Sequence, residues 1–195
     1  MVHRCSCGDL CSLFCCREQT MPGRFLTEAE RQALRGFPDR IAAEELSKFF
    51  VLGRDDLQFV GRHRREHNRL GIALQLCAIR WLGFCPDDLT GAPENAVETV
   101  AAQLGISPGV LVQYGQRPQT RTEHLREVLR YLGFRTPNQA DMTALAEWLA
   151  VQAMSHHDPR VLLQMATLHL RTLRIVRPGV TRLERLVVTV RSRRS

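Results

Sequence analysis

The chain has 195 residues, enough to bury a substantial hydrophobic core in one large or two small domains. No apolar run approaches the length of a transmembrane helix, which argues against a helical membrane protein. The formal net charge is +7, and residues 171–195 carry eight basic residues against one acidic residue. Nearly every cation is an arginine, whose guanidinium matches phosphate groups and guanine edges in bidentate geometry. A GC-rich genome would produce the same bias without any function.

The first part of the chain predicts several short helices. Thr27 and Glu30 match a capping box, which predicts a first helix that ends near Gly36. Two more short helices are predicted over residues 42–50 and 55–60. Helical rather than strand-like patterning continues along the whole chain, so we expect an all-α fold.

Residues 66–83 are predicted to form the central helix. This segment is apolar on almost every face, so we expect it in the middle of a core. Gly71 within it would let another backbone come close, at some cost in helix propensity. A further helix is predicted over residues 93–104. The basic segment 62–69 precedes the central helix, so its cationic groups would be mounted at the start of the most rigid element.

Glycine and proline punctuate residues 107–118, which indicates a boundary between two helical units. Beyond it, helices are predicted over residues 120–132, 138–153, 158–173 and 181–190, with caps at Thr120 with Glu123, Asn138, Asp158, and Thr181 with Glu184. We therefore expect a multi-helix bundle in two helical subdomains, 21–106 and 120–195, joined by a linker over 107–119. The second subdomain is predicted to hold a helix-turn-helix-like element.

Residues 1–20 hold five of the seven cysteines, at positions 5, 7, 11, 15 and 16. Their spacing is not that of a zinc knuckle, and the apolar run LCSLFCC is too short for a secretory signal. We interpret this segment as a disordered, Cys-rich extension that comes from a start codon placed too early. Cys77 and Cys85 are interpreted as core or near-core residues in a reducing cytoplasm.

Three basic segments are candidates for DNA binding. In the first, before the central helix, Arg62, Arg64 and Arg65 can neutralise phosphates. Asn68 can bond a base edge or a phosphate. An alternative is that Asn68 and Arg69 cap and brace the central helix.

The second candidate segment follows the predicted linker. Thr120, Arg121 and Thr122 lie at a predicted helix N-terminus, where unpaired amides favour a phosphate. Arg126 and Arg130 stand four residues apart opposite a leucine stripe, a like-charge pair that an anion would relieve. The third segment is the arginine-rich C-terminus, which would bind DNA regardless of sequence or act as a solvated linker. The candidate DNA-binding residues are Arg62, Arg64, Arg65, Asn68, Arg69, Arg117, Thr120, Arg121, Thr122, Arg126, Arg130, Arg174, Arg177, Arg182 and Arg185.

His63, Glu66 and His67 match H-x-x-E-H, the pattern of inverted zinc peptidases. On a helix the two imidazoles would face the same way, with Glu66 available as a base. Arg64 and Arg65, however, place fixed positive charges beside the proposed dication, and no third ligand is evident downstream. We therefore expect no metal site and no catalytic residue. A zinc peptidase and a helical protein–protein interaction module remain the alternatives to DNA binding.

Five separated blocks resemble a known family. They are MPGRFLTEAER (21–31), EHNRLGIALQLCAIRWLG (66–83), VAAQLG (100–105), RTEHLREVLRYLGFR (121–135) and VRPGVTRLERLV (176–187). Together they resemble the N-terminal region of the Tn-three-family transposases, the replicative bacterial enzymes of DNA transposition. The block His67-Asn68-Arg69 belongs to the matched sequence, whereas His63 does not.

In that family, this region is a helical DNA-binding portion that recognises the terminal inverted repeats, and the chemistry resides in a later acidic-triad domain. The resemblance implies binding of double-stranded DNA at transposon ends. From the residues themselves, we expect specificity to come from one inserted helix over residues 120–130. The resemblance also implies no catalysis and no cofactor in this chain. The expected location is the bacterial cytoplasm, in association with the nucleoid, and self-association would occur as part of a larger transposase. The chain would then be a truncated or split transposase, or one module of a larger one.

Overall fold

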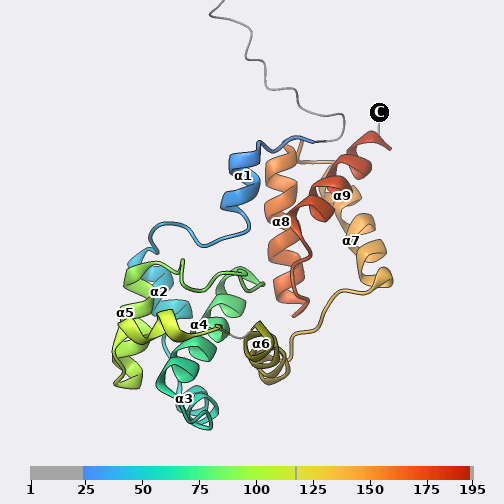
Figure 1. Cartoon of the computed structure of the whole chain (residues 1–195). Coiled ribbons are helices and arrows are strands. Elements are labelled where there is room, and N and C mark those ends of the chain that lie inside the picture. Colours follow the sequence, from blue (N-terminus) through green and yellow to red (C-terminus); the bar gives the residue numbers. More distant parts are fainter. Residues whose placement is uncertain (1–23, 117, 194–195) are drawn as a thin grey trace, which may run out of the picture.

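The computed structural model describes residues 24–116 and 118–193, which form an all-α protein (Figure 1). The helices are α1 (Glu28–Ala33), α2 (Ala43–Phe49), α3 (Arg54–Gly61), α4 (Glu66–Leu82), α5 (Glu94–Leu104), the 3-10 helix η1 (Pro108–Gln113), α6 (Pro118–Leu132), α7 (Gln139–Gln152), α8 (Pro159–Thr172) and α9 (Val180–Ser192). The predicted all-α class is confirmed. Strand-like pairing in the described residues is limited to one isolated bridge between Arg135 and Ile175. None of the described helices has the length and apolar content that a membrane crossing requires.

Helix α4 is the centre of the first hydrophobic core, as its all-round apolar pattern predicts. Leu70, Ile72, Leu76 and Ile79 are completely buried. Helices α2, α3, α5, η1 and α6 pack around it. Because each fully buried side chain of this size contributes about 1.5–3 kcal/mol relative to an exposed position, α4 is held firmly. Segments attached to its ends therefore have a rigid support.

Gly71 admits an aromatic ring and not, as predicted, another backbone. A Cβ atom at position 71 would lie well inside 3.0 Å of the ring carbons of Tyr114, an approach that real Cβ atoms essentially never show. Tyr114 follows η1 and is buried, and its hydroxyl lies 3.0 Å from Nδ1 of His124 on α6. The missing side chain at position 71 thus lets Tyr114 join α4 to α6.

Helices α7, α8 and α9 enclose a second hydrophobic core, to which Phe25, Leu26 and Leu34 on either side of α1 also belong. In Figure 1, α1 lies beside α8, with α9 on the other side of α8, although α1 is far from both in the sequence. Nε of Arg31 donates to Oε2 of Glu184 across 3.0 Å, and both side chains are almost fully buried. Oε1 of Glu184 accepts from the backbone N–H groups of Phe25 and Leu26, each at 2.9 Å. Helix α9 therefore holds the segment that leads into α1.

These two cores divide the chain differently from the predicted subdomains. Helix α6, predicted to open the second subdomain, packs on α4, and its Val128 is completely buried in the first core. Residues 107–119, predicted as a linker, include η1, whose Leu111 is buried against the same core. Phe25, Leu26 and Leu34, which flank α1, pack in the second core instead of the first. Along the chain, the first core ends with Phe134, and the second resumes at Met142.

Contacts between the two cores converge on the C-terminal end of α4. The guanidinium of Arg177 stacks on the ring of Phe84, 3.6 Å from its centroid, and donates to the carbonyl of Leu34 across 2.6 Å. Burial lowers the pKa of Arg177 to about 10. Arg171 on α8 donates to the carbonyl of Trp81 across 2.5 Å. These arginines join the α8–α9 region to α4.

The predicted helix starts are confirmed in part. Thr27 forms the expected capping box, and Asn138 is the expected N-cap, which forms a capping box with Asp141. Two other starts are wrong. Helix α6 begins at Pro118 and not at Thr120, because proline at the first helical position is already set to a helical φ. Helix α9 begins one residue before Thr181 and has no side-chain cap, because its N-cap residue is Gly179. Glu184 turns inward and accepts from the N–H of Leu26 instead.

Candidate nucleic-acid interface

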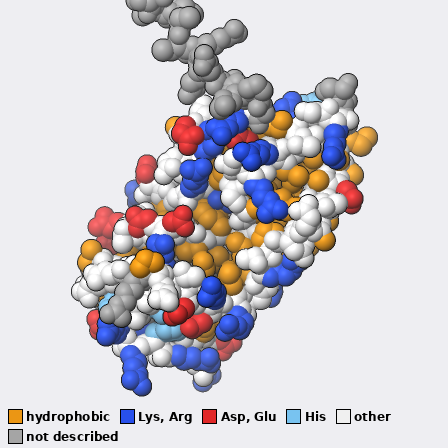
Figure 2. Space-filling view, turned by 45° about the vertical axis from the view of Figure 1, so that its right-hand side comes forward, with side chains coloured by type: hydrophobic (Ala, Val, Ile, Leu, Met, Phe, Trp, Pro, Cys, Tyr) orange, Lys and Arg blue, Asp and Glu red, His pale blue; other side chains and the backbone are white. Residues whose placement is uncertain are grey.

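The basic segment before α4 is an exposed turn. Arg62 ends α3, Arg64 and Arg65 follow, and all three are exposed without an ion pair among the described residues. Arg65 is the N-cap residue of α4, and its side chain makes no capping hydrogen bond. In Figure 2, Lys and Arg side chains project from the lower end of the molecule, where α3 lies in Figure 1. Because the first N–H groups of a helix carry positive partial charge, this turn favours an anion.

Two segments that are distant in sequence meet at a pocket of about 500 Å³. We name it the N-terminal pocket because it lies at the N-terminal ends of helices α4 and α6. The structure brings three predicted residues together there: Arg65 and Asn68 at the start of α4, and Thr120 in the first turn of α6. The other lining residues are His67, Gln113, Gly115 and Gln116. The sequence analysis missed these four, because no spacing rule connects residues 113–116 with 65–68. The described lining residues include no carboxylate, so the chemistry of this pocket suits a phosphate.

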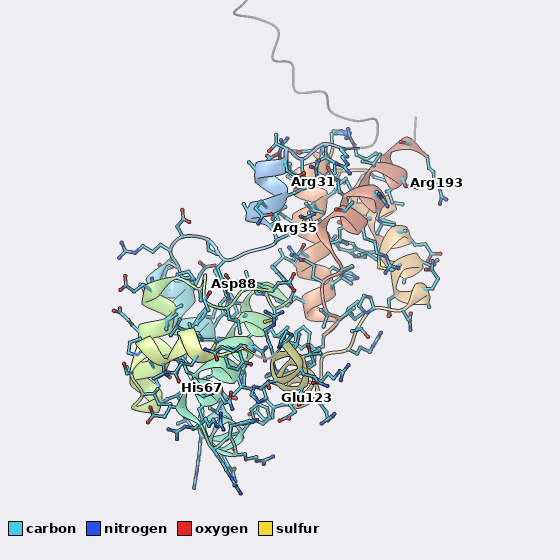
Figure 3. The ribbon with its side chains drawn as sticks, in the orientation of Figure 1. Arg31, Arg35, His67, Asp88, Glu123 and Arg193 are labelled. Atoms are coloured by element: carbon cyan, nitrogen blue, oxygen red, sulfur yellow. The ribbon has the colours of Figure 1, made fainter. Side chains whose placement is uncertain are left out.

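Helix α6 presents one exposed face, the outer face, to solvent. At about 100° per residue, Thr122, Arg126 and Arg130 lie on the same side of the helix, and each is exposed. Neither arginine forms an ion pair with another described residue. Glu123 lies on the same helix (Figure 3) and is also exposed. The outer face therefore carries donors and acceptors that suit base edges.

The element before α6 is a 3-10 helix, η1, and not the α-helix of a standard helix-turn-helix. The inner face of α6 is used for packing. Nε2 of Gln75 donates to the carbonyl of Arg121 across 3.1 Å, and the Arg121 guanidinium donates to the carbonyl of Asp87. His124 is buried, and its burial together with the charge of His63 lowers the pKa of His124. These contacts fix α6 on α4, so Arg121 does not belong to the outer face.

The H-x-x-E-H pattern does not form a helical metal site. His63 lies in the turn before α4, whereas Glu66 and His67 are in its first turn. Nε2 of His63 lies 3.3 Å from the carboxylate of Glu127, and its Nδ1 lies 3.3 Å from the carbonyl of Val60. In residues 24–116 and 118–193, no group of three or more potential ligands could hold a metal ion. The zinc-peptidase alternative therefore lacks its geometry.

The predicted C-terminal arginines have three different environments. Nη1 of Arg174 donates to the carbonyl of Leu132 at the end of α6, across 3.2 Å. Arg177 lies between the two cores, and its contacts favour a structural role over a place in the interface. Arg182 and Arg185 are exposed on α9.

Arg69 is half-buried, and its Nε is enclosed without a hydrogen-bond partner in the described part of the chain. This environment favours the bracing role over a phosphate contact. Arg117 and the cysteine-rich segment at residues 1–20 lie outside the described residues.

Comparison with known proteins places this arrangement in a family. Residues 25–190 match the family model described as Domain of unknown function (DUF4158). The chain belongs to this family. The match begins before α1 and ends in α9, so it includes both hydrophobic cores.

The DUF4158 chain is also similar to several transposases. It is 32% identical over 169 residues to the transposase for transposon Tn1546 of Enterococcus faecium, covering 86% of this chain and 17% of that protein. It is 34% identical over 176 residues to the transposase for transposon gamma-delta of Escherichia coli K12, covering 89% of this chain and 18% of that protein. It is 30% identical over 166 residues to the transposase for transposon Tn501 of Pseudomonas aeruginosa, covering 85% of this chain and 17% of that protein.

The chain therefore spans less than a fifth of the length of these relatives, in their N-terminal region. The predicted resemblance to the Tn-three-family transposases is confirmed.

Proposed function

We propose that this DUF4158 chain binds double-stranded DNA sequence-specifically, at the terminal inverted repeats of a transposon. The observation that carries the proposal is the N-terminal pocket, where Arg65, Asn68 and Thr120 meet at the N-terminal end of α6. The pocket offers a phosphate site, and the outer face offers side chains for bases. Homology to transposases supplies the class of DNA.

Helix α6 is the element that enters the major groove, which is about 12 Å wide and admits an α-helix. Arg126 and Arg130 then reach base edges, with Thr122 as an additional donor or acceptor. Because the inner face of α6 is packed on α4, the helix is presented rigidly, which specific recognition requires.

Sequence-independent attraction comes from the arginines outside α6. Arg62 and Arg64 extend the phosphate-binding surface beyond the N-terminal pocket, and Arg182 and Arg185 add positive charge on α9. Such contacts release counterions, so they make affinity strongly dependent on salt. This proposal assigns the chain DNA recognition and not strand transfer. It places the protein with the bacterial nucleoid in the cytoplasm, with self-association as part of a larger transposase.

The direct test is a binding titration with labelled duplexes at several salt concentrations. The probes are the terminal inverted repeats of transposons Tn1546, gamma-delta and Tn501, each against a scrambled duplex of the same length and base composition. We expect tighter binding to at least one set of ends, with log K falling linearly as log salt rises. Equal affinity for ends and scrambled DNA would contradict specificity. An absence of DNA binding would favour the protein–protein interaction module instead.

A further inference from the structure

A second cationic pocket lies at the C-terminal end of α6, and we name it the C-terminal pocket for that reason. It has a volume of about 560 Å³ and is lined by residues of α2, α4, α6 and α8 and of the segments that follow α6 and α8. Four cations line it, Lys48, Arg80, Arg171 and Arg174, and its described lining residues include no carboxylate. Only Arg174 belongs to the residues predicted to bind DNA.

One of these four cations is neutralised by an ion pair. The guanidinium of Arg80 donates to both carboxylate oxygens of Asp56, across 2.6 and 2.8 Å. Asp56 also accepts from the hydroxyl of Tyr131 across 2.8 Å, so its acceptor capacity is used within the protein. Lys48, Arg171 and Arg174 form no ion pair among the described residues. The pocket therefore keeps a net positive charge.

Neutral groups orient two of the unpaired cations. Nζ of Lys48 lies 5.2 Å from the centroid of the Phe49 ring, and the guanidinium carbon of Arg171 lies 5.4 Å from the same centroid. Arg171 also donates to the carbonyl of Trp81. An aromatic face and a carbonyl hold cations in place without cancelling their charge. An anion that enters the pocket thus meets charges that are already positioned.

Arg174 has a left-handed backbone, with φ of 54°, and it is the one non-glycine residue with positive φ in the described ranges. This conformation costs an ordinary L-residue about 1–2 kcal/mol, so glycine is the favoured residue there. The arginine keeps its guanidinium at the end of α6, bonded to Leu132. Strained positions of this kind concentrate at functional sites.

The two pockets are spaced along one side of α6. Thr120 lines the N-terminal pocket and Tyr131 lines the C-terminal pocket. Residues eleven apart lie three turns apart on the same side of a helix, which corresponds to about 16 Å. At about 100° per residue, this side differs from the outer face, so the two pockets are placed for backbone phosphates and the outer face for bases.

We propose that the C-terminal pocket binds a backbone phosphate of the same DNA duplex whose groove receives α6. The helix would then be clamped at both ends, with Lys48 and Arg174 as phosphate ligands. This inference rests on the DNA-binding function proposed above. It adds a contact from Lys48 on α2, which the sequence analysis did not assign, and places it in one pocket with Arg174, which was predicted to bind DNA.

Lys48 makes a direct test possible, because it is the single lysine of the chain. We would measure the rate at which its amine is acetylated by an amine-reactive ester, by mass spectrometry, with and without saturating transposon-end duplex. We expect several-fold slower labelling of Lys48 in the complex. The matched control is the Arg40→Lys variant, which adds a second amine at an exposed position away from both pockets. The labelling rate of that added amine should be unchanged by DNA.

Charge removal gives a second measurement. The Lys48→Ala/Arg174→Gly variant removes two cations from the pocket. Glycine is chosen at position 174 because it readily adopts the left-handed backbone found there. We expect the slope of log K against log salt to fall in magnitude by about 1–2, since each lost phosphate contact removes about 0.9. The control variant Arg35→Ala/Arg40→Ala removes the same charge from exposed positions outside the pocket.

The outcomes separate the two proposals. If the chain binds no DNA, the proposed function fails and the pocket proposal fails with it. If the ends are bound but Lys48 is labelled at the same rate with and without DNA, the pocket proposal alone is wrong. A slope that falls no further in the pocket variant than in the control variant also overturns it.

Discussion

Gly71 on α4 and Tyr114 after η1 form a fit that depends on the absence of a side chain. The Tyr114 ring occupies the space that a Cβ atom at position 71 would need. The ring is buried, and its hydroxyl lies 3.0 Å from His124 on α6. This contact connects the centre of the first core to the helix that we propose enters DNA.

We expect Gly71→Ala to destabilise the protein by about 1–3 kcal/mol, the usual cost of overpacking a core. The added methyl group would clash with the Tyr114 ring. Because that ring is buried, its neighbours would have to move with it. Thermal or urea denaturation measures the change. The control is Gly61→Ala at the end of α3, where a Cβ atom meets nothing within 4 Å. That variant should be neutral or slightly stabilised.

The Glu184–Arg31 pair predicts a loss of stability in acid. Burial by itself raises the pKa of Glu184, but the hydrogen bonds from Arg31, Leu26 and Phe25 outweigh it, so the pKa is lowered below 4.5. The unfolded state therefore binds a proton more readily than the folded state. The pair's contribution is fully present above pH 4.5 and is lost as the pH falls through the folded pKa. Urea denaturation across this pH range measures the loss.

Glu184→Gln should cost about 3 kcal/mol at neutral pH, because it leaves the buried Arg31 guanidinium without its charged partner. It should also reduce the acid sensitivity. Glu28→Gln is a matched comparison, since Glu28 pairs with the same Arg31 but its side chain is 69% exposed. Exposed pairs contribute about 0–1 kcal/mol, so this variant should differ little from the parent protein. Equal losses in the two variants would contradict the assignment.

Arginines on the two faces of α6 should behave differently. Arg126→Ala and Arg130→Ala should each reduce the preference for transposon ends over scrambled DNA, by about 1–3 kcal/mol if a bidentate base contact is lost. Arg121→Ala should keep the preference and lower stability by about 1 kcal/mol, because it removes the bond to the carbonyl of Asp87. The salt-series titration and urea denaturation provide both values. If all three variants weaken specific and non-specific binding equally, the outer face does not read bases.

Asp56 is expected to be important for stability, whereas the adjacent Asp55 is not. Asp56 is buried and accepts hydrogen bonds from Gly53, Arg80 and Tyr131. Asp56→Asn should therefore cost about 3 kcal/mol. Asp55 is exposed, so Asp55→Asn should change the free energy of unfolding by less than about 0.5 kcal/mol. Urea denaturation of the two variants compares them directly.

The positions of the helices were largely predictable, since apolar spacing and capping residues are local signals. The all-round apolar pattern of residues 66–83 correctly indicated the buried centre of a core. The charged partners were not predictable from the same information. Asp56 and Glu184 both lie near helix starts, where a carboxylate commonly caps the helix or stabilises its dipole. Asp56 does accept from the N-cap N–H of Gly53, but the charged partners of the two carboxylates, Arg80 and Arg31, are distant in sequence.

The candidate site follows the same pattern. Arg65 and Thr120 could each be selected from local composition, but their meeting at one pocket depends on how α6 packs on α4. The C-terminal pocket was missed for a related reason. Lys48 and Arg171 have no local signal that separates them from ordinary surface cations, and only the fold brings them together.

The placement of α1 has a consequence for how the chain folds as it is made. The first core closes within residues 41–134, whereas α1 must wait for α9, whose Glu184 lies 153 positions beyond Arg31. At about 5–20 residues per second, the ribosome needs several seconds to add the residues between the end of the first core and Glu184. During that interval the apolar residues that flank α1, Phe25, Leu26 and Leu34, have no final partner, so they are open to chaperones in the nascent protein and covered in the finished one.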